Sequence, residues 1–159
     1  MRDLEVHNIP LKNVTLQRLN PFNKEHKKAI SKLRDKDAKK MMYDVKQAFV
    51  DIKKNRDLGN SFLLKDKEEY IGYIYISNRH NKTERTISYM IEKTVRNKGY
   101  GKIVLNSISE YIFEECLADT LVLYIKDKNK PSISVAESCD FKYDSKLGST
   151  DTSIYKRTK

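Results

Sequence analysis

The spacing of the apolar residues changes sharply in the middle of the chain, and this change constrains the fold more than any other feature. Between residues 61 and 91, short apolar segments alternate with polar turns, which predicts a meander of β-strands. After Gly99, apolar residues recur every three or four positions, which predicts an amphipathic helix. A strand therefore runs through a glycine-containing segment directly into a helix.

The remaining elements follow from the same periodicities. A run of five apolar or aromatic residues at 121–125 predicts a central strand that is covered on both faces. The order is β-α-α-β-β-β-α-β-α-β-β, which predicts an α/β (α+β) class with a mixed, largely antiparallel sheet and helices on both faces. The expected strands are 14–19, 61–65, 70–77, 85–91, 121–125, 141–143 and 152–156, and the expected helices are 22–40, 42–58 (ending near Gly59), 100–112 and 131–138.

Length and composition set the broad class. The chain has 159 residues, which fits a single domain over 1–159, and 38% of them are hydrophobic. No run of 18 apolar residues exists, and the first ten residues lack the apolar core of a secretory signal, so we expect a cytoplasmic protein that does not cross a membrane. Two cysteines give no disulfide framework, and Cys116 is expected to be buried. The three histidines show no metal-ligand spacing, so no metal is expected.

The net charge of +10 is unevenly spread. Residues 24–56 hold twelve Lys or Arg against five Asp or Glu. Such a balance raises the possibility of a nucleic-acid or ribosome-associated protein. The lysines alternate with apolar residues at helical spacing, however, which is typical of solvated helix faces. We therefore expect nonspecific contacts with nucleic acid at most.

The segment at 96–102, Arg-Asn-Lys-Gly-Tyr-Gly-Lys, stands where the strand passes into the helix. Glycines at a helix N-terminus let the backbone approach an anion, and the free N–H groups of the first turn point at it. The helix dipole adds ~0.3–1 kcal/mol, and Arg96 and Lys102 add positive charge. The segment therefore predicts a cradle for a pyrophosphate.

Two common phosphate-binding fingerprints do not fit. A P-loop requires Ser or Thr after Gly-Lys, and residue 103 is Ile. The dinucleotide fingerprint requires a third glycine at 104, which is Val. Arg96, Gly99 and Gly101 do match a third pattern, Arg/Gln-x-x-Gly-x-Gly/Ala.

This pattern resembles that of the GNAT superfamily of acetyl-CoA-dependent N-acetyltransferases. A second match follows the central strand, where Asn129, Ser132 and Phe141 stand at the places of the family's Asn, Ser/Ala and Phe. The element order matches that fold from about residue 14 to residue 156. The strand at 87–91 looks most like the branch of ribosomal-protein N-terminal acetyltransferases.

The resemblance implies a set of binding residues for acetyl-CoA. Backbone N–H groups of the cradle would hold the pyrophosphate, and the backbone of Met90 and Ile91 would pair with the pantetheine arm and polarise the thioester carbonyl. The strands at 87–91 and 121–125 would splay apart around the cofactor. Asn129 and Ser132 would contact the pantetheine, and the implied cradle residues are Arg96, Asn97, Lys98, Gly99, Tyr100, Gly101 and Lys102.

The chain departs from the family at two places. Ala136 stands where many members have the Tyr that protonates the leaving thiolate, and Asp140 replaces the usual Gly, which requires a left-handed turn. Tyr124, Tyr143 and Tyr155 are alternative acids, and Glu92 is a candidate base or a plain loop carboxylate. Tyr73, Tyr75 and Tyr89 line the acceptor pocket or serve only packing.

The function that the resemblance implies is transfer of an acetyl group from acetyl-CoA to a primary amine by direct attack. The amine would belong to a protein N-terminus, a lysine or a small molecule. A catalytically weak acyl-CoA-binding module is the alternative that Ala136 favours. The basic helices suit an acceptor that carries negative charge or is bound to RNA, and a homodimer is possible in this family.

Overall fold

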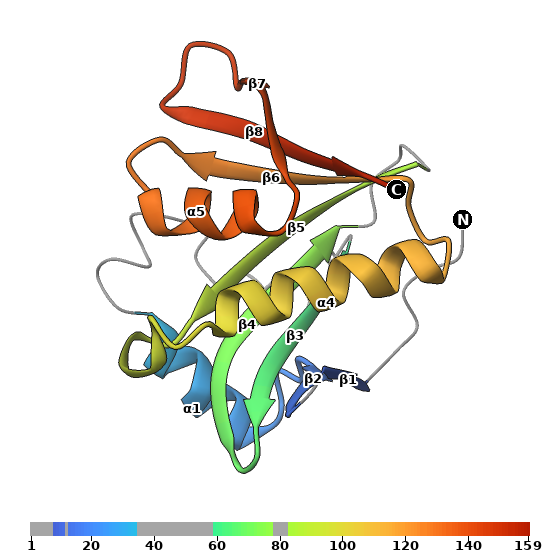
Figure 1. Ribbon diagram of the computed structural model, residues 1–159. Coiled ribbons are helices and arrows are strands. Elements are labelled where there is room, and N and C mark those ends of the chain that lie inside the picture. The colour runs from blue at the N-terminus through green and yellow to red at the C-terminus, as the bar shows by residue number, and fades with distance from the viewer. Residues whose placement is uncertain (1–7, 12, 35–58, 78–82) are drawn as a thin grey trace.

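The computed structural model describes residues 8–11, 13–34, 59–77 and 83–159. Eight strands and four helical segments make up this part of the chain (Figure 1). The strands are β1 (Asn8–Leu11), β2 (Val14–Arg18), β3 (Gly59–Asp66), β4 (Glu69–Ser77), β5 (Glu84–Ile91), β6 (Thr120–Lys126), β7 (Lys142–Lys146) and β8 (Thr152–Thr158). The helices are α1 (Lys24–Leu33), the 3₁₀ turn η1 (Lys93–Val95), α4 (Tyr100–Glu114) and α5 (Lys130–Ser138).

The strands form one mixed sheet in the order β1-β2-β3-β4-β5-β6-β8-β7. Every neighbouring pair is antiparallel except β5 and β6, which run parallel because α4 connects them as a crossover. The parallel pair therefore lies in the middle of the sheet and separates a meander on one side from a three-stranded group on the other.

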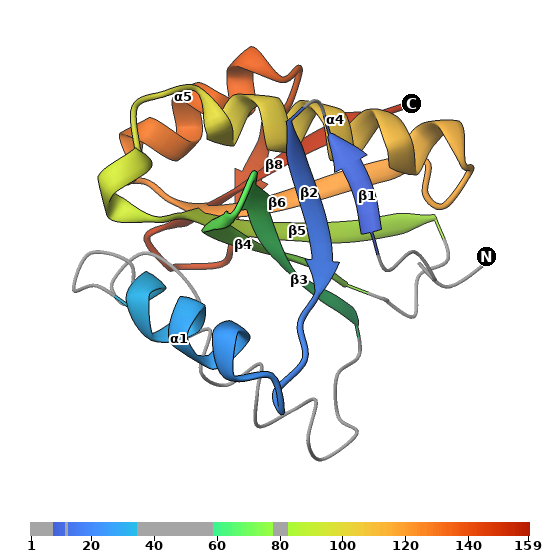
Figure 2. The ribbon, with the colours of Figure 1, turned by 90° about the horizontal axis from the view of Figure 1, so that it is seen from below.

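Helices cover both faces of this sheet, as Figure 2 shows: α4 and α5 lie on one face and α1 lies on the other. Successive side chains along each strand point to opposite faces of the sheet, so each face has its own set of packed residues. On β3, Leu64 packs into the core beneath α4, whereas Leu63 packs against α1. On β4, Ile74 and Tyr73 divide in the same way.

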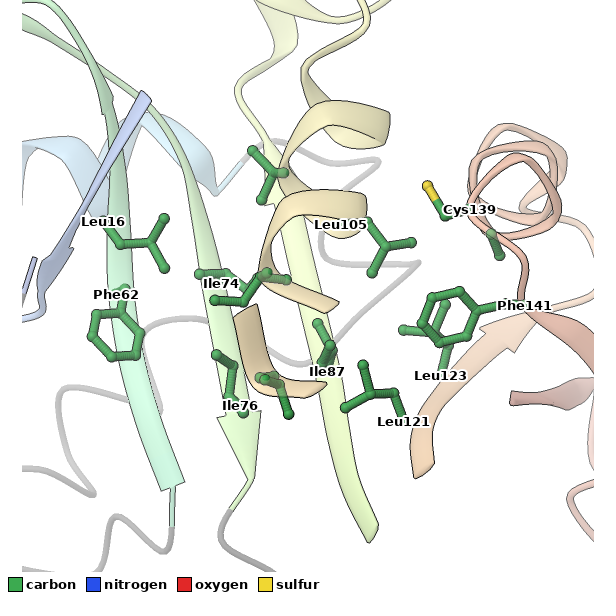
Figure 3. Close-up of a cluster of buried hydrophobic side chains, with 14 of the residues drawn as sticks. Leu16, Phe62, Ile74, Ile76, Ile87, Leu105, Leu121, Leu123, Cys139 and Phe141 are labelled. Carbon is green, nitrogen blue, oxygen red and sulfur yellow. The ribbon is translucent and has the colours of Figure 1, made fainter. Parts of the chain in front are cut away.

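The larger core lies between the sheet and the helices α4 and α5. Figure 3 shows side chains from β2 to β6 in a continuous row, with Leu105, Cys139 and Phe141 at the end nearest α5. Leu105 is fully buried and Phe141 is 1% exposed. This core fixes where α4 begins and where α5 lies over the sheet.

The predicted fold class is confirmed, with three differences in detail. An additional strand, β1, precedes the first predicted one, and the predicted helix at 42–58 lies outside the described residues. Gly59, which was expected near the end of that helix, is the first residue of β3. Cys116, expected to be buried, is exposed, because α4 ends at Glu114 and the chain turns there with a left-handed φ of 54° at Cys116.

Candidate functional site

The two parallel strands at the centre of the sheet separate halfway along their length. Their ladder has three residue pairs, from Glu84 opposite Thr120 to Thr86 opposite Val122. Beyond this point β5 continues beside β4, and β6 continues beside β8. Figure 1 shows the two strands diverging toward the start of α4 and toward α5. The predicted splay between 87–91 and 121–125 is thus confirmed.

The register of β4 and β5 determines which backbone groups face this opening. Glu92 N donates to Ile71 O at 2.7 Å, so the even-numbered residues at the end of β5 bond to β4. The backbone groups of Tyr89 and Ile91 consequently point toward β6. Met90 differs from the expectation: its carbonyl points at Gly72, and its side chain packs against α1.

A short loop carries the chain from β5 to α4. The Glu92 carboxylate caps η1 by accepting a hydrogen bond from Thr94 N at 3.1 Å and another from the Thr94 hydroxyl. Arg96 turns back and donates from Nε to Ile91 O at 2.9 Å. The guanidinium thus ties the loop to the last residue of the strand, in addition to supplying positive charge.

The two glycines of the cradle meet different requirements. Gly99 is the N-cap of α4 with a φ of 82°, a left-handed conformation that favours glycine. Gly101 is helical, and a Cβ placed there would lie 3.4 Å from Tyr89 Cε2 and 3.8 Å from Val135 Cγ2, which is ordinary contact. This difference explains physically why the pattern demands Gly at the first place and accepts Gly or Ala at the second.

Tyr100, the first residue of α4, anchors the cradle to the β3–β4 hairpin. Its hydroxyl donates to Asp66 Oδ2 at 2.5 Å, and this hydrogen bond is the main reason that the pKa of Tyr100 is raised. The N–H groups of the first turn of α4 are thereby held in a fixed direction relative to the sheet. The side chains of Asn97, Lys98 and Lys102 are exposed around them.

Helix α5 closes the other side of the opening. Asn129 is its N-cap, and Asn129 Oδ1 accepts from Ser132 N at 3.4 Å. Ala136 is fully buried in the core, so its side chain does not reach the opening. Asp140 follows the C-cap Cys139 of α5 and has a φ of 65°, the left-handed conformation expected at this place.

Tyr89 is a site residue whose position the sequence did not reveal. Its ring lies between β5, Gly101 of α4 and Val135 of α5. Burial raises the pKa of Tyr89 to about 12, and the nearby Ser132 side chain opposes that shift. The alternation of β5 places Tyr89 on the α4 side, whereas the sequence alone suggested the acceptor pocket or plain packing.

The proposed catalytic residues lie on the opposite face of the sheet. Glu92 lies two residues after Met90 and therefore on the same face of the sheet, which α1 covers. Lys32 Nζ of α1 lies 4.0 Å from Glu92 Oε2. Tyr124 is on β6 between Leu123 and Ile125, both of which pack beneath α4 and α5, so it too faces away from those helices. Tyr155 is buried in the core, and Tyr143, 58% exposed, packs edge-on against it.

Metal-binding clusters and membrane-spanning helices are both absent from residues 8–11, 13–34, 59–77 and 83–159. No three His, Cys, Asp or Glu side chains gather closely enough there to hold a metal ion. No helix of the same ranges is long and apolar enough to span a membrane.

Comparison with known families agrees with this geometry. The sequence model of the acetyltransferase (GNAT) domain matches residues 17–142, which is most of the chain. No curated protein matches the sequence significantly.

Solved structures of acetyltransferases share the fold at low sequence identity. The microcin C7 self-immunity acetyltransferase MccE, in complex with acetyl-CoA and AMP, is 16% identical with a TM-score of 0.75, covering 99% of both chains. The Salmonella typhimurium acetyltransferase that modifies the N-terminal serine of ribosomal protein L7/L12 is 14% identical with a TM-score of 0.78, covering 96% of this chain and 99% of that one. The aminoglycoside acetyltransferase AAC(6')-Ib with coenzyme A is 14% identical with a TM-score of 0.75, covering 92% and 95%.

Proposed function

Because the chain belongs to the GNAT acetyltransferase family, we propose that it transfers the acetyl group of acetyl-CoA to a primary amine. The observation that carries this proposal is the separation of β5 from β6 directly beside the glycine-containing start of α4. An elongated ligand with an anionic end fits such a site. Its anion meets the helix N-terminus, and its arm lies along the free edge of β5.

The donor site is assembled from backbone groups. We assign the pyrophosphate to the N–H groups of 97–102, next to Arg96 and Lys102. The pantetheine arm runs along β5, where the Ile91 N–H and the backbone groups of Tyr89 face the opening, while the Ile91 carbonyl accepts from Arg96. Asn129 and Ser132 contact the arm from α5. In three of the acetyltransferase structures with this fold, acetyl-CoA or coenzyme A is bound.

The reaction is a direct attack of a neutral amine on the thioester carbonyl. The Ile91 N–H, which faces the opening, stabilises the oxyanion that develops, and the coenzyme A thiolate leaves. Glu92 and Tyr124 lie on the face opposite α4 and α5, where we place the acceptor. There Glu92 acts as the base, directly or through water, and Tyr124 acts as the acid. Holding the two reactants together supplies much of the acceleration.

The acceptor side carries positive charge. Residues 24–34 include five Lys or Arg and one Glu. The side chains of four lysines on α1 are exposed: Lys24, Lys27, Lys28 and Lys32. Because Lys32 lies beside Glu92, this charge reaches the end of β5. We infer that the acceptor amine belongs to a molecule with negative charge, such as an acidic peptide or a phosphate-bearing compound. Positive potential also favours the neutral form of the amine.

Calorimetry and a thiol assay test the function. Purified protein should bind acetyl-CoA saturably and should release free coenzyme A thiol when a suitable amine is present. A panel of amines in matched pairs, with and without a phosphate or an acidic flank, tests the acceptor class. Absence of acetyl-CoA binding would reject the whole proposal.

A binding module without catalysis is the second candidate, because Ala136 offers no hydroxyl and is enclosed in the core. Binding of acetyl-CoA without thiol release across the entire panel would support it. Acyl transfer to any amine of the panel would reject it.

We propose one acetyltransferase domain over 1–159, which the presence of strands from Asn8 to Thr158 in one sheet supports. We further propose a cytoplasmic enzyme that needs no metal and contacts nucleic acid only nonspecifically. A homodimer is compatible with the family, and size-exclusion chromatography with light scattering tests it.

A further inference from the structure

We propose that Tyr89 is a positioning residue of the acyl-CoA site, whose hydroxyl completes its hydrogen bond with Ser132 when the pantetheine arm binds. This inference rests on the proposed acetyl-CoA site. It concerns a residue outside the motifs that identify the family. The observations that carry it are the burial, the direction and the incomplete hydrogen bonding of one phenol.

The first observation is an orphaned polar atom. Tyr89 Oη is inaccessible to solvent, and no group in the described ranges offers it a hydrogen bond of normal geometry. A buried hydroxyl that lacks a partner costs about 1–3 kcal/mol. Few such groups persist in folded proteins, and they call for an explanation.

The second observation is where this hydroxyl lies. Tyr89 is on the part of β5 that has parted from β6, and its backbone faces the opening. Its side chain enters the wedge between the first turn of α4, at Gly101, and the first turns of α5, at Val135. The three elements that would surround the pantetheine arm therefore meet at this ring.

The third observation is the neighbour. The Ser132 side chain is close enough to Oη to lower the pKa of the phenol, although burial outweighs it and raises the pKa to about 12. The two hydroxyls are thus near each other without a well-formed bond. A ligand that orients Ser132 from the opening would fix its hydroxyl and give Tyr89 the acceptor that it lacks.

The same phenol is unsuited to protonating the leaving thiolate. With a pKa of about 12, it stays protonated across the physiological range and gives up its proton reluctantly. It is therefore a constant hydrogen-bond donor. It does not replace the acid that is missing at Ala136.

Tyr89→Phe separates this role from a purely structural one. Without ligand, the variant should unfold at the same temperature as the wild type or a higher one, because it removes an unsatisfied buried hydroxyl. Its dissociation constant for coenzyme A should rise about five- to tenfold, the usual worth of one hydrogen bond. The increase should be the same at pH 6 and pH 9, because neither hydroxyl titrates between them.

A double-mutant cycle identifies the partner. Ser132→Ala should weaken binding by at least the same factor, because it also removes the contact of Ser132 with the arm. The double variant should be no weaker than Ser132→Ala alone, because the bond to Tyr89 is already lost in that variant. Tyr111→Phe, which removes a phenol hydroxyl far along α4, is the matched control and should leave affinity unchanged.

Two results would overturn the inference. One is wild-type affinity in Tyr89→Phe, and the other is a loss of thermal stability in the free variant that parallels the loss of binding. Additive effects in the cycle would reject Ser132 as the partner and with it the proposed bond. If the wild-type protein itself fails to bind coenzyme A, the proposed function fails instead, which is a distinct outcome.

Discussion

The two faces of the sheet are built on different principles. Beneath α4 and α5, buried side chains from β2 to β8 form one continuous core, and the proposed donor site consists largely of backbone groups that this core holds in place. On the α1 face, a smaller cluster joins Ala29, Ile30 and Leu33 to the sheet, and the proposed acceptor side is formed by exposed lysines. The proposed donor site therefore depends on backbone geometry, and the proposed acceptor side depends on charge.

This difference has a chemical logic. The donor is the same molecule at every turnover, so a rigid arrangement of N–H groups serves it well. An acceptor approaches a surface whose long side chains adapt, and charge selects it with little demand on exact shape. Substitutions on the two faces should therefore change different properties of the protein: stability and acetyl-CoA affinity on one face, and the KM for a charged acceptor on the other.

The largest expected difference is in stability. Leu105→Ala should lower the free energy of unfolding by about 4 kcal/mol, and Ile30→Ala by about 2 kcal/mol, within the usual range of core truncations. Leu105 is enclosed between the sheet and α5, so its cavity cannot collapse, whereas α1 can settle onto the sheet. Urea unfolding measures both. Equal losses would contradict the distinction between the faces.

Backbone strain in the cradle should come next. Gly99→Ala forces a Cβ onto a residue with a φ of 82°, which costs about 1–2 kcal/mol and should weaken acetyl-CoA binding about tenfold. The KM for the amine should stay the same. Gly101→Ala, at a helical position with room for a methyl group, should keep or raise stability. Calorimetry and thermal unfolding give both quantities, and a stability loss in Gly101→Ala would show that its contact with Tyr89 is tighter than we infer.

Charge reversal on α1 should give a smaller, salt-dependent effect. Lys27→Glu combined with Lys28→Glu should raise the KM for a negatively charged acceptor about three- to tenfold at low salt and much less at high salt. The affinity for acetyl-CoA should not change. Lys142→Glu on β7 is the control for charge alone. A matching rise in KM for a neutral acceptor would contradict selection by charge.

The smallest expected effect concerns pH. His26 of α1 accepts a hydrogen bond from Asn20 N at 3.0 Å through Nδ1, and burial, with Lys65 nearby, lowers its pKa from the ordinary 6.5. As the pH falls, the imidazole is therefore protonated in the unfolded chain before it is protonated in the folded protein. The contribution of His26 is complete above pH 6.5 and is lost as the pH falls through its lowered pKa.

Urea unfolding between pH 7.5 and pH 5 measures this loss. In His26→Gln the part of the pH dependence that is due to this imidazole should disappear. An unchanged slope in the variant would mean that other groups cause the acid sensitivity.

The sequence predicted the backbone at the start of α4 better than the directions of the side chains on β5. Gly99 could be predicted because a left-handed backbone favours glycine, whereas Gly101, where a methyl group would fit, was found only through the pattern. The face toward which the Tyr89 side chain points could not be predicted from the sequence. It depends on the register of β5 against β4, and a shift of one residue would move the side chain to the other face. The backbone of Met90 bonds to β4 instead of facing the opening for the same reason. The exposure of Cys116 depended on the residue at which α4 stops, which periodicity fixes poorly.

The short parallel ladder also bears on how the molecule opens. Three residue pairs join β5 to β6, whereas seven join β6 to β8, so the ladder at the parallel pair is the shorter of the two. Spontaneous opening of the native state should begin there, with the segments before and after α4 exchanging their amide hydrogens as two separate units. A ligand bound across this seam would join the two units, and it would protect amides in both of them at once.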